Sequence, residues 1–168
     1  MPTGGSFVGE RDEQSAVESG ADQVEPRLQP VIEAMATLRR RCPWSSRQDH
    51  QSLEKYALEE TDELIDALED FTAKPTAELR AGVVEELGDV FYQVLFHSAL
   101  LDESSGHAYG HSLGAVIEGL EAKLIRRHPL AFTDDSGDEM ASLEDVEREY
   151  HRIKAEEKTT LRGEDRTG

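Results

Sequence analysis

The chain has little cysteine, little positive charge and no long apolar run. A single cysteine, Cys42, among 168 residues excludes an intrachain disulfide and suits a reducing compartment. No apolar stretch approaches the roughly 20 residues that span a bilayer. The N-terminus lacks the basic and then apolar order of a secretory signal. We therefore expect a cytoplasmic protein with no membrane partner.

Positive charge is scarce enough to exclude one class of function. The chain carries 18 Lys and Arg against 36 Asp and Glu, which gives a net charge of −18. A general nucleic-acid binder needs a basic footprint for the phosphate backbone, so we expect no nucleic-acid partner. A small phosphate ligand remains compatible with this composition, because it needs only a few local cations and a metal ion.

Hydrophobic residues make up only 37% of a chain whose length fits one domain, which predicts that part of it is unfolded. Residues 1–25 are rich in Gly, Ser, Asp, Glu and Gln and have no sustained apolar period. We therefore predict a disordered acidic tail over 1–25, a folded domain over 26–160 and a flexible C-terminal tail over 161–168.

The remaining sequence predicts an all-α fold of four or five helices. Apolar residues recur at spacings of three and four, and no segment alternates as a strand would. The predicted helices cover residues 26–41, 51–71, 77–101, 112–128 and a last stretch from 143 onward. The third is expected to be the longest and the most buried, because apolar residues surround much of its girth. Thr76 is a plausible N-cap for it.

Two of these helices carry paired carboxylates. Glu60 and Glu63 lie three residues apart, and Glu86 and Asp89 repeat that spacing, so each pair projects from one helical face. Acidic residues at helical spacing most often form a solvated face, and this chain has many of them. Both pairs, however, interrupt apolar stripes, where a carboxylate is desolvated unless something neutralises it.

A short connector favours antiparallel packing of the two helices, which would let the pairs face one another. Four carboxylates that close together repel, and a shared cation is the natural resolution. All-oxygen sites suit magnesium, calcium or manganese, and magnesium commonly completes its shell with water and phosphate oxygens. A di-iron bundle would use Glu-x-x-His, and no histidine of this chain has a glutamate three residues before it.

Four sequence segments in order resemble the MazG-type nucleoside triphosphate pyrophosphohydrolases. The resemblance spans about residues 28–158. Its segments are Cys42-Pro43-Trp44 with Gln48-Asp49-His50-x-Ser52-Leu53, Glu59-Glu60-x-x-Glu63, Glu85-Glu86-Leu87-Gly88-Asp89-Val90 with Gln93-Val94, and Lys123-x-x-Arg126-Arg127-His128-Pro129 with Ile153-Lys154-x-Glu156-Glu157-Lys158.

The resemblance implies a MazG-like helical bundle completed by dimerisation, as a homodimer or a dimer of dimers. It implies that water attacks the α-phosphorus of a nucleoside or deoxynucleoside triphosphate and that pyrophosphate leaves. Magnesium would be the cofactor, with manganese as the alternative. The implied metal ligands are Glu60, Glu63, Glu86 and Asp89.

The implied residues around the metal ligands have less defined roles. Glu59 would support the ligands or help to activate the water. Lys123 and Arg127, with Arg126 as a companion, would contact the phosphates. Cations near the end of a helix also have a purely structural explanation, since they interact favourably with the helix dipole.

Three further residues are candidates for substrate contact. Trp44, the only tryptophan, either lines the base pocket or anchors the core. His50 either contacts the nucleotide or caps the second helix. Tyr150 stands where the family often has tryptophan, and Gly82 stands where some members have lysine, which affects base preference and phosphate contacts but leaves the metal site intact.

Two other functions compete with this hypothesis. A phosphoribosyl-ATP pyrophosphohydrolase shares the helical architecture, although the segments around Trp44 and after Arg127 favour the MazG type. A non-catalytic helical module could use the acidic surface to bind a basic partner. Such a module would release no pyrophosphate and would tolerate loss of Glu63.

Overall fold

The computed structural model describes residues 13–132 and 141–164, and within these ranges the secondary structure is entirely helical. This confirms the predicted all-α class. The chain divides into two compact units, residues 1–113 and 114–168. The elements in order are α1 (Glu13–Arg41), the 3₁₀-helix η1 (Ser45–Arg47), α2 (His50–Ala73), α3 (Ala77–Ser105), α4 (His111–Arg127), the 3₁₀-helix η2 (Pro129–Ala131) and α5 (Leu143–Glu164).

Both terminal helices extend into segments that were predicted to be tails. Helix α1 begins at Glu13, so residues 13–25 are helical, and Pro26 lies inside the helix instead of at its start. Helix α5 continues to Glu164. The prediction relied on the lack of an apolar period, but Glu, Gln and Ala favour helix even where no side chain packs. Residues 1–12 and 165–168 lie outside the described residues.

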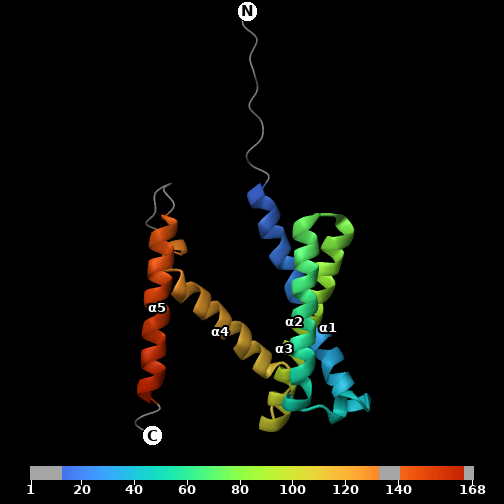
Figure 1. The fold of residues 1–168 in the computed structure, drawn as a ribbon. Coiled ribbons are helices and arrows are strands. Elements are labelled where there is room, and N and C mark those ends of the chain that lie inside the picture. The colour runs from blue at the N-terminus through green and yellow to red at the C-terminus, as the bar shows by residue number, and fades with distance from the viewer. Residues whose placement is uncertain (1–12, 133–140, 165–168) are drawn as a thin grey trace, which may run out of the picture. The chain divides into compact units, whose positions relative to one another are not determined.

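Helices α2 and α3 form an antiparallel hairpin, in which they run side by side (Figure 1). The start of α2 is fixed by a capping box, in which the Asp49 carboxylate accepts from the Ser52 N–H at 2.7 Å and the Ser52 hydroxyl accepts from the Asp49 N–H at 2.9 Å. Thr76 caps α3 as predicted by accepting from the Leu79 N–H. The cap of α2 is thus Asp49, and the suggestion that His50 fills this role was wrong.

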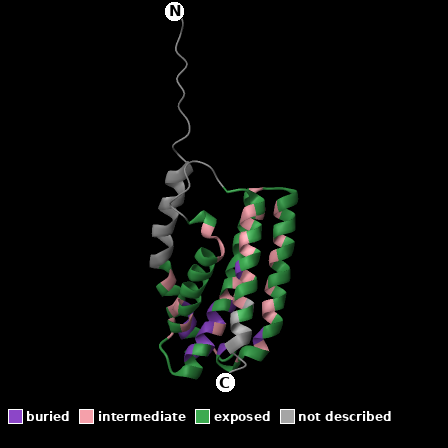
Figure 2. Ribbon diagram, turned by 90° about the vertical axis from the view of Figure 1, so that its left-hand side faces the viewer, coloured by how far each residue is buried: buried purple, intermediate pink, exposed green. Residues whose placement is uncertain are grey.

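The core of the first unit lies at the end of the hairpin away from the α2–α3 connection, as the buried residues in Figure 2 show. It consists of Met35, Leu53, Leu95, Phe96, Ala99, Leu100 and Leu113. The other half of α3 leaves apolar side chains open, with Val84 55% and Leu87 52% exposed. Only the second half of α3 is therefore buried in the single chain, although the whole helix was predicted to be.

The connection from α3 to α4 is organised by one buried acid. The carboxylate of Asp102 accepts hydrogen bonds from the backbone N–H groups of Gly110 and Ser112, at 2.9 and 2.8 Å. Burial alone would raise the pKa of Asp102, but the hydrogen bonds from Ser112 and Gly110 lower it. Gly110 has a φ of 100°, and a Cβ there would lie 3.2 Å from Ile32. A side chain at this position would be disfavoured both by the backbone conformation and by the contact with Ile32.

The second unit contains most of α4 together with η2 and α5. Its helices are held by ion pairs from Arg126 and Arg127 to Glu157. In the part of the chain that the structure describes, no helix has the length and hydropathy needed to cross a membrane.

Candidate metal and nucleotide site

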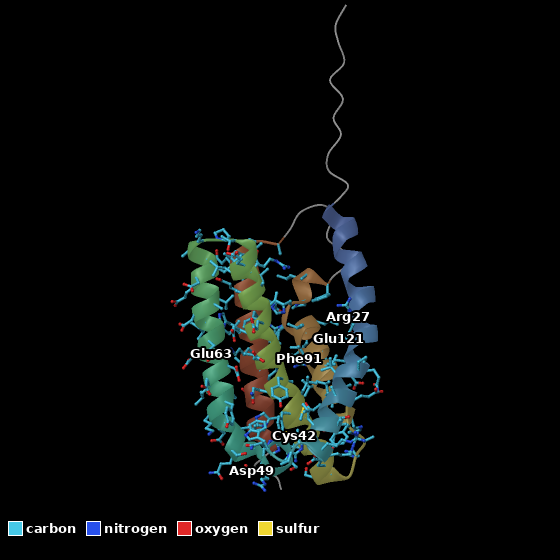
Figure 3. All side chains as sticks on the ribbon, turned by 90° about the vertical axis from the view of Figure 1, so that its right-hand side faces the viewer. Arg27, Cys42, Asp49, Glu63, Phe91 and Glu121 are labelled. Carbon is cyan, nitrogen blue, oxygen red and sulfur yellow. The ribbon has the colours of Figure 1, made fainter. Side chains whose placement is uncertain are left out.

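Three of the predicted carboxylates meet across the α2–α3 hairpin. Glu60 and Glu63 on α2 and Glu86 on α3 each offer one oxygen, and these oxygens all lie within 4.8 Å of one another. Figure 3 labels Glu63 on α2, with Phe91 marking the neighbouring α3. The sequence predicted that the acidic pairs face one another if the helices are antiparallel. The hairpin produces this arrangement for the three glutamates.

Asp89 lies next to this carboxylate cluster, defined here as Glu60, Glu63 and Glu86. It is not within the 4.8 Å group. Its charge nevertheless acts on two of the three members, because it raises the pKa of Glu60 and of Glu86. Asp89 is therefore close enough to feel a cation in the cluster.

Burial and mutual repulsion disfavour the charged form of the cluster. Burial raises the pKa of Glu60, and the charges of Asp89 and Glu63 raise it further. Burial likewise raises the pKa of Glu86, followed by the charges of Glu63 and Asp89. Like charges held together in this way are stabilised by a cation, which reverses the sign of the local field.

One oxygen of the carboxylate cluster has no partner within the protein. The Oε2 atom of Glu86 is buried and makes no hydrogen bond. A buried acceptor that is left without a partner costs free energy. A cation bound by the three glutamates would satisfy this oxygen, and the donor set, all carboxylate, suits magnesium or manganese. The residues present therefore fit a divalent metal.

Glu59 lies one residue before Glu60 and is exposed. Its charge contributes to the raised pKa of Glu60, which places it near the cluster without making it a member. This position is compatible with the predicted role beside the metal ligands.

Trp44 packs on the core, which agrees with one of the two alternatives that the sequence left open, and its contact with a base stays a prediction. Its ring packs edge-on against Tyr56 and Phe96, with ring centroids 5.7 and 6.1 Å away. The residue remains 45% exposed. One part of the indole thus anchors the N-terminal end of α2 to α3, and another part is free to contact a ligand.

The segment that follows Trp44 is held by an arginine that the sequence did not single out. Arg39, on α1, donates to Glu103 on α3 through Nε and Nη2, both at 2.7 Å. Its Nη1 donates to the carbonyl of Ser45 and, at 3.3 Å, to that of Gln48. Arg39 is one of three arginines at the end of α1, and nothing in their pattern marks it as the buried one.

His50 contacts another histidine at the first turn of α2. The Nδ1 atoms of His50 and His97 are 2.8 Å apart, and the rings are stacked with centroids 5.1 Å apart. Burial lowers the pKa of His97, and the neighbouring His50 lowers it further. The pair joins the first turn of α2 to α3.

The predicted phosphate-binding residues belong to the second unit. Lys123 is exposed on α4. Arg126 and Arg127 donate to the same carboxylate, Glu157, at 2.7 and 2.6 Å. Hydrogen bonds from Arg127 and Arg126 lower the pKa of Glu157 to about 2.

Tyr150 lies beside these cations. The guanidinium carbon of Arg127 is 5.8 Å from the centre of its ring, and the His128 ring centroid is 5.4 Å away. The second unit thus gathers Arg126, Arg127 and Tyr150.

A helical hairpin with a carboxylate cluster defines an all-α protein with a candidate divalent-cation site, and comparisons with known proteins agree. The sequence model of the MazG nucleotide pyrophosphohydrolase domain matches residues 48–132, about half of the chain, and the chain belongs to this family. A crystal structure of a MazG-related protein from Thermotoga maritima has a TM-score of 0.57 and 23% identity. It covers 76% of this chain and 99% of that one, which supports the fold.

Curated relatives cover more of the sequence. An uncharacterised 26.1 kDa protein of Streptomyces cacaoi is 42% identical over 79% of this chain and 50% of its own length. A nucleoside triphosphate pyrophosphohydrolase of Mycolicibacterium smegmatis is 39% identical over 79% of this chain and 37% of its own length. The chain thus spans half or less of the length of these relatives.

Proposed function

We propose that this protein hydrolyses nucleoside or deoxynucleoside triphosphates to the monophosphate and pyrophosphate, with magnesium, or manganese in its place, as cofactor. The observation that carries the proposal is the carboxylate cluster, in which three glutamates from two helices meet and one buried oxygen lacks a partner. Family membership and the relative named for this activity support it.

The carboxylates supply the metal ligands in this proposal. Glu60, Glu63 and Glu86 hold the cation. Asp89 lies beside them and adds a further negative charge. When bound, magnesium offsets negative charge on the phosphate oxygens and lowers the pKa of a coordinated water. Because the cluster and the triphosphate are both negative, the triphosphate needs a cation between them to bind there.

The remaining chemistry is a hydrolysis at the α-phosphorus. The oxygen of water bonds to this phosphorus, the bond to the bridging oxygen breaks, and pyrophosphate leaves with the electron pair. Glu59 accepts the proton of the attacking water. Lys123, Arg126 and Arg127 neutralise the triphosphate and the departing pyrophosphate.

Two aromatic side chains and one histidine contact the nucleoside in this proposal. Trp44 stacks on the base with the part of its ring that the core leaves free. His50 and Tyr150 contact the nucleotide from the start of α2 and from α5. The base that fits best is to be found by a substrate screen.

Dimerisation is part of the proposed function. The apolar side chains that α2 and α3 leave open include Leu58, Ile65, Leu68, Val84 and Leu87. Contiguous apolar surface of this kind mostly marks a protein interface. A second copy of the chain, related by a twofold axis, would cover it.

A pyrophosphate-release assay across canonical and modified triphosphates, with and without magnesium, tests the activity. We expect release only with the metal, and a loss of at least about 100-fold in Glu63→Gln, because a catalytic metal site loses one ligand. Asp62→Asn is the matched control, since Asp62 is an exposed acid next to Glu63 on the same helix. Its rate should stay within about twofold of wild type.

Three results would decide against the proposal or redirect it. No release from any triphosphate with magnesium would contradict it and favour a non-catalytic acidic module. Equal activity in Glu63→Gln and Asp62→Asn would show that the carboxylate cluster is not the active centre. Turnover of phosphoribosyl-ATP alone would assign the chain to the other helical pyrophosphohydrolase reaction.

A further inference from the structure

Gln93 is a buried polar residue with an acceptor that no protein group satisfies. The residue is 7% exposed, and its Oε1 atom is buried without a hydrogen-bond partner. The neighbouring buried hydroxyl of Ser98 shows the usual situation, since it donates to the carbonyl of Val94 at 2.8 Å. A buried amide oxygen without a protein partner calls for an explanation, and a donor on a bound ligand is one.

Helical geometry places Gln93 on the face of α3 that carries the carboxylates. Seven residues separate it from Glu86, which brings the two side chains to within about 20° of the same direction around the helix. Gln93 lies about 10 Å beyond Glu86 along the helix axis, and about 6 Å beyond Asp89. It is the first uncharged polar residue that follows the acids on this face.

The opposing helix brackets the same position. Glu60 and Glu63 of α2 meet Glu86 of α3, while further along the hairpin His50 meets His97 at 2.8 Å. Gln93 lies between these two cross-helix contacts in the α3 sequence. Phe96, three residues later, contacts the ring of Trp44. The order along the hairpin is therefore the carboxylate cluster, then Gln93, then the aromatic group around Trp44.

A nucleotide has the same order of groups. Its phosphates are followed by the sugar and then by the base. If the phosphates lie at the carboxylate cluster and the base at Trp44, then the sugar lies at Gln93. The amide oxygen is an acceptor and finds its donor in a sugar hydroxyl, whereas phosphate oxygens are acceptors themselves.

We propose that Gln93 determines specificity for the sugar of the nucleotide, by accepting a hydrogen bond from a sugar hydroxyl through Oε1. This inference rests on the proposed function. The amide oxygen can accept from either the 2′- or the 3′-hydroxyl. Substrate analogues that lack one hydroxyl or the other distinguish the two cases. A substrate that lacks the hydroxyl leaves the buried oxygen without a partner and is disfavoured.

The experiment crosses the enzyme variant with the substrate analogue. The best triphosphate from the screen is compared with its 2′-deoxy and 3′-deoxy analogues, in wild type and in Gln93→Met. We expect one of the two analogues to lower kcat/KM of the wild type about tenfold. In Gln93→Met the ratio of kcat/KM between parent and analogue should fall to within about twofold, because the thioether of methionine is only a weak acceptor and costs little when unsatisfied.

Ser98→Ala is the matched control, because Ser98 is buried on the same helix but its hydroxyl is satisfied. It should keep the full discrimination of the wild type. Gln93→Leu serves as a second apolar variant if Gln93→Met fails to fold, and circular dichroism checks the fold of each.

Three outcomes overturn the inference. Equal discrimination in wild type and Gln93→Met would overturn the role of Gln93 and leave the hydrolase proposal standing, as would a wild type that treats both deoxy analogues like the parent. The absence of pyrophosphate release from every triphosphate would remove the proposed function and this inference with it.

Discussion

At the scale of single residues, the carboxylate cluster stores unfavourable electrostatic energy that a cation relieves. Burial and the neighbouring charges raise the pKa of Glu60 and Glu86. A group whose pKa is higher in the folded than in the unfolded protein stabilises the fold below its unfolded pKa. It loses that contribution as the pH rises through the folded value. In metal-free protein, the cluster therefore destabilises the fold at neutral pH.

Removing one charge should stabilise the metal-free protein. We expect metal-free Glu86→Gln to have a higher Tm than wild type at pH 7, because the remaining acids repel less. The difference in Tm should disappear as the pH falls below 4.5, the ordinary pKa of this carboxyl group, because wild-type Glu86 is then also neutral. Thermal unfolding in a chelator, from below pH 4.5 up to neutral pH, measures the difference in Tm between the two proteins.

Added magnesium should make the Tm of wild type higher than that of Glu86→Gln. A ligand that binds only the folded state stabilises it by about 2.7 kcal/mol at one hundred times its Kd. We expect this gain in wild type and a much smaller one in Glu86→Gln. An equal gain in both proteins would show that the cation binds elsewhere, and a lower metal-free Tm in Glu86→Gln would contradict the repulsion.

At the scale of secondary-structure elements, a few buried polar residues hold the helices of the first unit together. Arg39 connects α1 to α3 through Glu103, and to η1 and the start of α2 through two backbone carbonyls. Hydrogen bonds from Arg39 lower the pKa of Glu103, so this pair stabilises the fold above the ordinary pKa of the carboxyl group and less as the pH falls through the lowered value.

Replacing the arginine should loosen both the fold and the segment with Trp44. We expect Arg39→Met to lose roughly 2–3 kcal/mol of stability, less than for a fully buried pair, because Glu103 is 33% exposed and regains water. Arg40→Met is the control, since Arg40 is exposed on the same helix. Urea unfolding gives the stabilities, and tryptophan fluorescence, with Trp44 as the only tryptophan, reports the local change.

The double variant Arg39→Met with Glu103→Leu provides a second check on the ion pair. It removes both charges and should recover part of the loss, because no carboxylate is left without its partner. A double variant as unstable as the sum of the two single variants would show that the two side chains do not act as a pair.

At the scale of the whole molecule, the exposed apolar surface of α2 and α3 calls for a partner. The core occupies one end of the hairpin, and the other end carries open side chains such as Ile65 and Leu87. A groove on α2, lined by Ile65, Leu68, Glu69, Thr72 and Ala73, lies at this end. We therefore expect the chain to assemble as a dimer, or as a dimer of dimers.

Disrupting this surface should change the oligomeric state. We expect wild type to sediment as a dimer or larger, and Ile65→Lys to shift the equilibrium toward monomer by at least about tenfold, because a lysine must be desolvated in an apolar interface. Asp66→Lys is the control, since it places the same side chain at an exposed polar position of the same helix, with an even larger change in charge. A wild type that sediments only as a monomer, and still turns over, would contradict the dimer.

Much of the site followed from local sequence. Helical spacing predicted that Glu60 with Glu63, and Glu86 with Asp89, project as pairs, and the short connector predicted that they meet. Oxygens of Glu60, Glu63 and Glu86 do meet, because spacing on a helix depends on the backbone alone. Asp89 lies outside this group, and the role of all four residues as metal ligands stays a prediction. The helical conformation of residues 13–25 was not predicted for a related reason, since an apolar period reports packing and a helix can form without it.

The sequence by itself determined the all-α class and the places of the helices along the chain. It also determined the acidic pairs and the family to which the chain belongs. Only the tertiary structure decided that Arg39 is the buried arginine and that Gln93 keeps an unsatisfied oxygen. It also decided that half of α3 stays open. The physical reason is that burial and hydrogen-bond partnership depend on residues far apart in the chain, whereas helix formation and spacing depend on near neighbours.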